Sequence, residues 1–232
     1  MEDLKQLLSQ LDANSSVGSI ESTFSKIAEI LLLHSKICIG DKIYTIEEIE
    51  FYYFKNGCLN GPIYNCTYPR DCRACDFFFH YSGVDICFES TEDSFGGVLI
   101  RSLKKKEDKN YVLIGGPLRC ANELANTSIQ EGKKIELIVD NHYKKDSIIE
   151  RTIRQGIKAD YEAKNKKVFP KVRFCYYIKQ KNKDWSRTRK GVYKPINGAD
   201  TKEFNPTKEL VDRYKDNPED RITNLEIKLK RP

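Results

Sequence analysis

A single stretch decides the fold of this chain: residues 43–54, with the sequence IYTIEEIEFYYF. The stretch is dense in β-branched and aromatic residues, which predicts a β-strand. Successive side chains of a strand point to opposite faces. One face therefore carries Tyr44, Ile46, Glu48, Glu50 and Tyr52, and the other carries Thr45, Glu47, Ile49, Phe51 and Tyr53. Because a carboxylate is costly to bury unpaired, Glu48 and Glu50 mark either a solvated edge or a site that needs a carboxylate.

A guanidinium interrupts the next long apolar strand, which we expect over residues 95–103. Arg101 lies among residues apolar enough to be buried, and a buried guanidinium requires an anionic partner. That partner is either one of the strand glutamates or a phosphate of a substrate, and the local sequence leaves both open.

Composition places the chain among globular proteins of one domain. It has 232 residues, of which 39% are hydrophobic and 32% charged, and a net charge of +6. We expect no membrane span and no secretory signal, so the cytoplasm is the default compartment. The mild excess of basic residues permits nucleic-acid binding without requiring it. We expect no cofactor and a monomer.

Eight cysteines in a chain of this length predict reduced thiols rather than a disulfide scaffold. Four of them, Cys58, Cys66, Cys72 and Cys75, fall in one loop over residues 56–76. Four thiols suit tetrahedral zinc, but the spacing lacks the paired motif of a zinc ribbon. The loop is therefore either a weak zinc candidate or a group of scattered thiols.

The remaining patterns predict helices and hairpins around these strands. We expect helices over residues 1–11, 22–34, 117–124 and 147–154, and hairpins that turn at Gly40-Asp41 and Ser82-Gly83. Residues 134–139 and 171–179 predict two further strands. The basic stretch 180–190, which contains Trp185, suits either a nucleic-acid surface or a solvated loop.

Taken in order, these segments resemble the 3-methyladenine (alkyladenine, or methylpurine) DNA glycosylase family. The similar blocks are residues 24–39, the Glu-x-Tyr strand end at 50–52, the hairpin 77–89, Val-Leu-x-Arg-x-Leu at 98–103, Gly-Pro-Leu-Arg-Cys at 116–120, 154–157 and 172–186. The resemblance implies a single-domain α/β (α+β) fold with a curved, mostly antiparallel sheet flanked by helices. It covers residues 22–186, and leaves an N-terminal helix and linker (1–21) and a basic C-terminal extension (187–232).

The resemblance also implies an activity and a site. Such enzymes flip a damaged purine out of duplex DNA and hydrolyse its N-glycosidic bond. Glu50 is then the general base, and Arg101 contacts the DNA backbone beside the flipped nucleotide. The base would stack between Tyr52 and Phe79, and Glu89 stands where the family has a pocket asparagine. The expected DNA contacts are Tyr81, Ser82, Gly83, Arg154 and Trp185, with Ser82 at the position of the family's wedge tyrosine.

Two other functions follow from the same residues. A relative of the same fold that binds nucleic acid without catalysis would also carry these blocks. A small-molecule N-glycoside hydrolase would use Glu50 and Glu89 as paired carboxylates. A purely structural role is the third reading, because no single motif is decisive.

Overall fold

The computed structural model describes residues 2–11, 17–55, 70–107, 110–140, 146–152, 154, 174–179, 185–187 and 193–195. Three helices lie in these ranges, α1 (Glu2–Ser9), α2 (Val17–Leu33) and α3 (Pro117–Glu131). The strands are β1 (Ser35–Ile39), β2 (Lys42–Lys55), β3 (Phe77–His80), β4 (Gly83–Cys87), β5 (Ser94–Glu107), β6 (Asn110–Gly115), β7 (Glu136–Val139), β8 (Ile149–Thr152), β9 (Cys175–Ile178), β10 (Trp185–Arg187) and β11 (Tyr193–Pro195).

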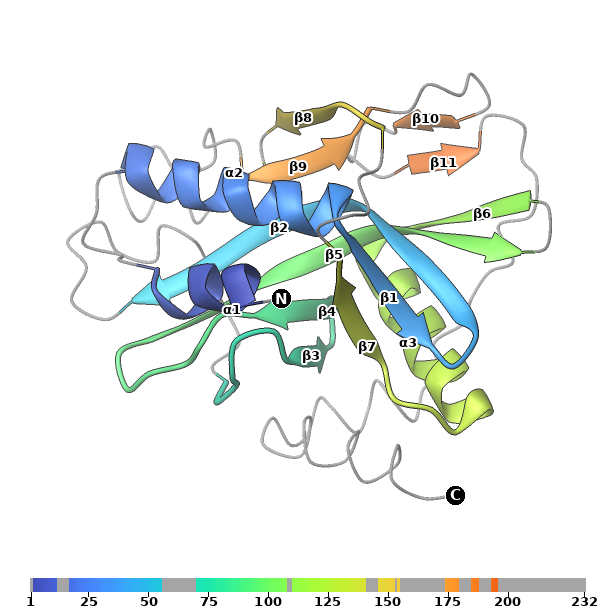
Figure 1. The fold of residues 1–232 in the computed structure, drawn as a ribbon, viewed down its shortest axis with the longest axis horizontal. Coiled ribbons are helices and arrows are strands. Elements are labelled where there is room, and N and C mark those ends of the chain that lie inside the picture. Colours follow the sequence, from blue (N-terminus) through green and yellow to red (C-terminus); the bar gives the residue numbers. More distant parts are fainter. Residues whose placement is uncertain are drawn as a thin grey trace.

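A curled antiparallel sheet of nine strands organises the molecule (Figure 1). Its main path runs β3-β4-β5-β2-β1-β7, while β6 pairs with β5, and β9 joins β2 to β8. The long strand β2 is central because it pairs with β5, β1 and β9. The fold is thus a single α+β domain with a curled antiparallel sheet, as the sequence predicts at this level.

Helices α1 and α2 cover one face of the sheet with an aromatic core. The ring of Phe24 on α2 stacks on that of Phe51 on β2, with centroids 4.2 Å apart. The rings of Phe88 and Phe174 pack against Phe24 from two further segments. Leu4 of α1 is fully buried in this core, so the N-terminal helix belongs to the folded domain.

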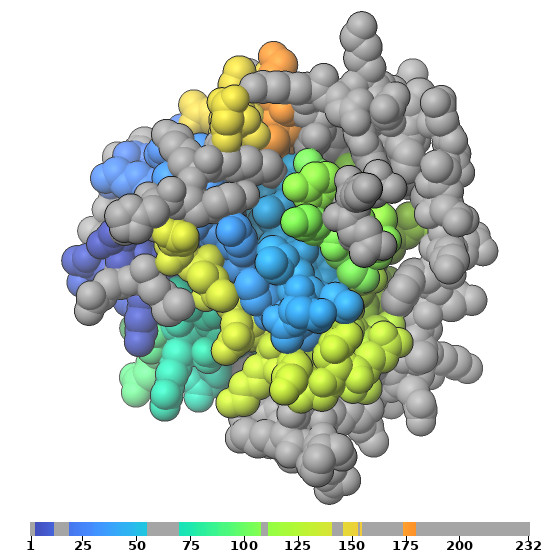
Figure 2. Space-filling view, turned by 45° about the vertical axis from the view of Figure 1, so that its right-hand side comes forward, coloured from blue at the N-terminus to red at the C-terminus, as the bar shows by residue number. Residues whose placement is uncertain are grey.

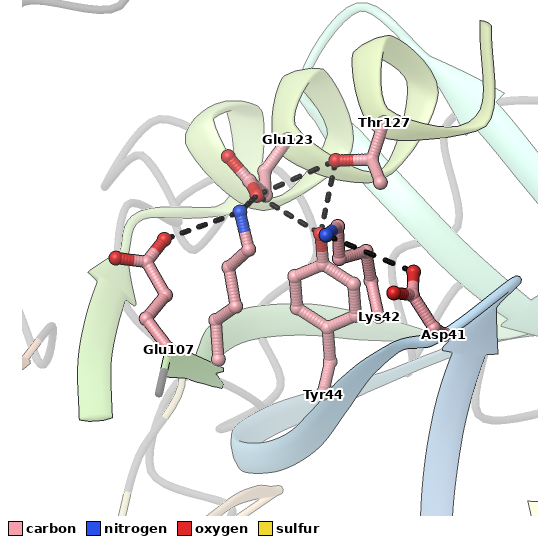
Figure 3. A network of polar contacts seen from close by, with 7 residues as sticks. Asp41, Lys42, Tyr44, Glu107, Glu123 and Thr127 are labelled. Carbon is pink, nitrogen blue, oxygen red and sulfur yellow. Dashed lines mark hydrogen bonds and ion pairs between the residues drawn. The ribbon is translucent and has the colours of Figure 1, made fainter. Parts of the chain in front are cut away.

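Helix α3 packs on the other face and is held by a polar network (Figure 3). The hydroxyl of Tyr44 on β2 donates to Glu123 Oε1 at 2.9 Å and lies 2.9 Å from Thr127 Oγ1. Lys105 on β5 adds an ion pair with Glu123 at 3.0 Å. Burial and the nearby Glu123 carboxylate raise the pKa of Tyr44 to about 12, so the phenol keeps its proton and remains a donor.

The structure confirms both predicted hairpins, although the second turns one residue earlier than expected, and it corrects three helices, of which α2 begins at Val17 and not near residue 22. The chain turns at Gly40-Asp41 between β1 and β2, and at Tyr81-Ser82 between β3 and β4. Residues 147–154 are not a helix, because residues 149–152 form strand β8, whose backbone pairs with β9. Helix α3 extends to Glu131, beyond the predicted end at residue 124.

Other expectations fall partly outside the described residues. Strand β11 pairs with β10 across the expected boundary at residue 187, and the rest of the C-terminal extension is not described. None of the helices in the described ranges combines the length and the apolar character that crossing a bilayer demands.

Candidate functional site

Two irregularities in the β2–β5 ladder lie at the charged residues. Ile46 is opposite Leu103 and Glu48 is opposite Ser102, which leaves Glu47 as an extra residue on β2. Ile49 is then opposite Ile100, which leaves Arg101 as an extra residue on β5. Such bulges bend a strand and redirect side chains, and they are common beside functional sites.

Arg101 bridges the two strand glutamates in the interior. Its Nη1 lies 2.9 Å from Glu50 Oε2, and its Nε lies 3.4 Å from Glu48 Oε1. Both glutamate side chains are fully buried, and that of Arg101 is 7% exposed. Of the two partners that the sequence leaves open for Arg101, the structure shows the strand glutamates.

Each carboxylate has a further hydrogen-bond donor. The Tyr52 hydroxyl donates to Glu50 Oε2 at 2.8 Å. Glu48 accepts from the Ser102 hydroxyl and from the Cys175 thiol, each at 3.4 Å. The carboxylates are therefore paired and hydrogen-bonded, which is the condition under which a protein interior tolerates them.

Arg154 supports the ring of Tyr52. Its guanidinium lies 5.0 Å from the Tyr52 ring centroid and 5.6 Å from that of Phe174, and Nη1 donates to the Phe51 carbonyl oxygen at 3.2 Å. The side chain is buried, so the predicted DNA contact through Arg154 is corrected: this arginine is packed inside the cluster, against the aromatic ring of the site.

Burial and charge together set the ionisation of these groups. Burial alone would lower the pKa of Arg101, but the carboxylates of Glu50 and Glu48 raise it above its ordinary value. Desolvation, reinforced by the Glu50 carboxylate, raises the pKa of Tyr52 well above its usual range. Tyr52 therefore stays a neutral donor to Glu50, and Arg101 stays cationic.

A second charged cluster occupies the same face of the sheet. Asp85 is directly opposite Leu99, which is opposite Glu50, so the two residues share a face with their backbones about 10 Å apart. Asp85 Oδ2 accepts from Arg70 Nη1, and Asp85 Oδ1 lies 3.1 Å from His80 Nε2. Arg70 thus pairs with Asp85 as Arg101 pairs with Glu48 and Glu50.

Glycine makes room for the second cluster. A Cβ at Gly97 would come within 2.5 Å of Asp85 Cβ and 2.8 Å of Arg70 Nη1. Gly97 is directly opposite Tyr52 in the sheet. The Arg70–Asp85 pair, which fills the space beside Gly97, is therefore a neighbour of Tyr52 on the same face. The sequence reasoning missed this pair, although Asp85 inside an apolar strand is a signal of a buried carboxylate in need of a cation.

The structure corrects the predicted positions of Phe79 and Glu89. Phe78, not Phe79, is directly opposite Asp85 and so shares the face of Glu50. Phe79 therefore points to the opposite face, where it belongs to the core under α1 and α2. Glu89 follows β4 and accepts from the Ala74 backbone N–H at 2.7 Å. Glu89 lies beyond the end of β4 at Cys87, and its backbone N–H donates to the Leu8 carbonyl oxygen, so it stands outside the ladder that carries Glu50.

The hairpin tip lies apart from Glu50. Tyr81 is 50% exposed and Ser82 is exposed, so both are accessible to a partner. Gly83 is buried, and a Cβ on it would come within 2.9 Å of Pro117 at the start of α3. Trp185 lies in β10, where its backbone pairs with Pro195. The expected DNA contacts of Tyr81, Ser82, Gly83 and Trp185 stay predictions.

The cysteine loop is described only in part. Cys72 is buried with Cys87 and Phe78, and Cys75 is half-buried elsewhere in the loop, while Cys58 and Cys66 lie outside the described residues. Within the part of the chain that the structure describes, no three His, Cys, Asp or Glu side chains are grouped closely enough to hold a metal ion. The six described cysteines are free thiols.

The cluster combines the elements of a hydrolytic site in one place. It holds a buried carboxylate, a guanidinium paired with it and a partly exposed aromatic ring, which are the group types that a general base and its neighbours require. Buried, specifically paired titratable groups of this kind are functional-site candidates, although structural ion networks also produce them.

Comparison with known proteins adds no family to this description. No family model matches the chain. No curated protein matches it, and no solved structure does.

Proposed function

We propose that the chain is a DNA glycosylase-like enzyme that hydrolyses the N-glycosidic bond of a damaged purine, with a methylpurine-glycosylase-like fold. The ordered sequence blocks support this proposal, and so does the cluster of Glu50, Tyr52 and Arg101. The observation that carries it is the Glu50 carboxylate, which accepts from the Tyr52 hydroxyl at 2.8 Å and from Arg101 at 2.9 Å on the face of the sheet that bears Tyr52.

The chemistry assigns one step to each residue. Glu50 takes a proton from a water molecule, whose oxygen attacks the sugar carbon, and the base leaves with the electron pair of the broken bond. Arg101 holds the Glu50 side chain in place through the ion pair at 2.9 Å, and the resemblance assigns this arginine a contact with the DNA backbone beside the flipped nucleotide. The exposed part of Tyr52 provides a surface on which a base stacks, a contact worth roughly 1–3 kcal/mol. The base needs a second stacking partner other than Phe79, because Phe79 belongs to the opposite face.

The burial of Glu50 favours a second candidate, a nucleic-acid-binding relative without catalysis. Glu50 is fully buried, and its contacts with Tyr52 and Arg101 both converge on Oε2. A general base must reach its water within hydrogen-bond distance, so substrate binding has to open a path to the carboxylate. If water never reaches Glu50, the cluster has only a structural role and stabilises the sheet beneath a binding surface.

Base release from defined duplexes tests the proposal. The protein and its E50Q variant are incubated with duplexes that carry 1,N6-ethenoadenine, hypoxanthine or 3-methyladenine, and abasic sites are then cleaved with alkali. We expect strand breaks with the parent protein and a rate lower by roughly 10²–10⁴-fold with E50Q. Equal rates for the two proteins would contradict the role of Glu50.

The other functions predict different results in the same assay. Duplex binding without strand breaks by either protein would support the inactive relative. Release of base from free nucleosides, but not from duplexes, would support a small-molecule N-glycoside hydrolase.

A further inference from the structure

Strands β5 and β6 extend beyond the rest of the sheet as a two-stranded arm. Lys105 is the last β5 residue opposite β2, so Lys106 and Glu107 pair only with Tyr111 and Asn110 of β6. We call residues 104–107 and 110–113 the β5–β6 arm. Lys104 and Lys105, at its base, still lie beside β2, and Lys106–Glu107 with Asn110–Tyr111 form its two-stranded end. Figure 1 shows this arm projecting to the right of the sheet, and Figure 2 shows β6 on the surface of the molecule.

The three consecutive lysines of the arm have different surroundings. Lys105 points towards α3 and forms an ion pair with Glu123 of that helix at 3.0 Å. It forms a second ion pair with Glu107 of its own strand at 3.3 Å. Lys104 and Lys106 lie on the opposite face of the arm, because side chains alternate along the strand. Neither of these two forms an ion pair with any residue that the structure describes. Two positive charges are therefore presented together on one face.

An exposed aromatic ring lies between these charges. Tyr111 is directly opposite Lys106, and the ammonium of Lys104 lies 4.6 Å from the Tyr111 ring centroid. The Tyr111 side chain is 56% exposed. The contact with Lys104 holds the ammonium over the ring on the outer side of the strand pair. Lysines interleaved with an exposed aromatic ring form a surface suited to polyanions with aromatic groups.

A second basic hairpin lies beside the arm. Strand β11 contacts β6, and it pairs with β10 (Figure 1). The sequence from residue 181 to 194 that includes both strands has six Lys or Arg residues against one Asp. The sequence around β10 and β11 is thus basic, a composition that suits a phosphate backbone.

We propose that the β5–β6 arm is a duplex-DNA-binding element, with Lys104 and Lys106 on backbone phosphates and Tyr111 against the same duplex. A two-stranded ribbon has the width that the major groove of B-DNA admits. The partner is the DNA of the proposed function, but the arm is a different surface from the Glu50 cluster. Thr45 is opposite Lys104, and it lies on the face of β2 away from Tyr44 and Glu50.

The test measures binding of the full chain to a short, undamaged, fluorescein-labelled DNA duplex at several salt concentrations. In the K104Q/K106Q variant we expect the slope of log K against log salt to fall by about 2, because each lost phosphate contact accounts for roughly 0.9. The affinity at low salt should fall roughly tenfold or more. The matched control is K26Q/K134Q, which removes the same charge from exposed positions outside the arm.

Each result has a definite reading. Loss confined to K104Q/K106Q supports the arm. Equal losses in both pairs, no loss in either, or no binding of duplex DNA by the parent chain would overturn it. The binding assay does not require base release. A parent chain that binds through the arm but releases no base would therefore contradict the proposed function and still support this inference.

Discussion

The buried contacts of Asp85 with His80 and Arg70 make the free energy of unfolding depend on pH in the acid range. Burial would raise the pKa of Asp85, but His80 and Arg70 lower it from 3.8 to about 2. A depressed folded-state pKa stabilises the fold above the unfolded value, and this stabilisation is lost as the pH falls from about 4 towards 2. Its size is on the order of 2 kcal/mol.

The D85N variant isolates this effect. We expect its free energy of unfolding, measured with urea, to be about 3 kcal/mol lower than that of the parent at neutral pH, because Arg70 loses its buried partner. The difference between the two proteins should shrink by on the order of 2 kcal/mol between pH 5 and pH 2. A difference that stays constant over this range would show that Asp85 does not titrate as described.

Arg101 has a comparable role for Glu48 and Glu50. The R101M variant leaves both carboxylates buried without the guanidinium, and we expect a loss of about 3–5 kcal/mol in urea denaturation. The E50Q/R101M double variant should lose less than the sum of the single variants, because only Glu48, and no longer Glu50, is then left as a buried charge without Arg101. Additive losses would mean that Arg101 and Glu50 do not interact.

A surface lysine provides the control for this cycle. Lys105 also contacts carboxylates, but its side chain is 20% exposed, whereas that of Arg101 is 7% exposed. The K105M variant should therefore lose only about 1 kcal/mol or less.

At the residue scale, the alternation of β2 was enough to place Glu48, Glu50 and Tyr52 on one face. The ion pair of Arg101 was one of two predicted alternatives, since burial demands a partner without naming it. The stacking role of Phe79 came from the resemblance alone, and the pairing of β3 with β4 places this ring on the face opposite that of Glu50. Arg154 gave no local signal of burial, because its partners Tyr52 and Phe174 are distant in sequence.

Among the elements, the β3–β4 hairpin depends on a glycine where it meets α3. Gly83 has a φ of +155°, and a Cβ on it would lie 2.8 Å from Leu99 Cδ1 and 2.9 Å from Pro117 Cβ. Both the backbone conformation and the close approach exclude a side chain. This contact fixes the exposed hairpin tip relative to the start of α3.

The G83A variant tests this contact against a second glycine. We expect a loss of about 2–4 kcal/mol in free energy of unfolding, from backbone strain and overpacking combined. Gly132, after α3, also has a positive φ (+60°), but nothing lies within 4 Å of the position of its Cβ. The G132A variant should therefore lose only about 1 kcal/mol, and equal losses in both variants would exclude the steric contribution.

The elements differ in how far local sequence determines them. The hairpin at Gly40-Asp41 was predictable because its turn residues and flanking strands are adjacent in sequence. Residues 147–154 were predicted as a helix, yet residues 149–152 pair with β9. That pairing joins Ile149 to Ile178, and no window around residue 149 contains the partner. The bulges at Glu47 and Arg101 likewise depend on the register between two strands.

For the whole molecule, the sheet separates two environments. One face packs aromatic and aliphatic side chains under α1 and α2. The other bears Glu48, Glu50 and Asp85 with their ion-pair partners Arg101 and Arg70. The composition predicted one domain with a core, and the order of segments predicted an antiparallel sheet. The balance of charges across three strands was not predictable, because it requires the strand order and Arg70 from a loop.

The whole account depends most on Glu50 as the group that accepts the proton of water. The most direct measurement is the single-turnover rate of base release from a duplex with a damaged purine, compared between the parent, E50Q and E89Q. Glu89 is a matched glutamate that lies outside the cluster and bonds to Ala74. The account predicts a rate roughly 10²–10⁴-fold lower for E50Q and nearly unchanged for E89Q. Base release by E50Q at the parent rate would contradict it.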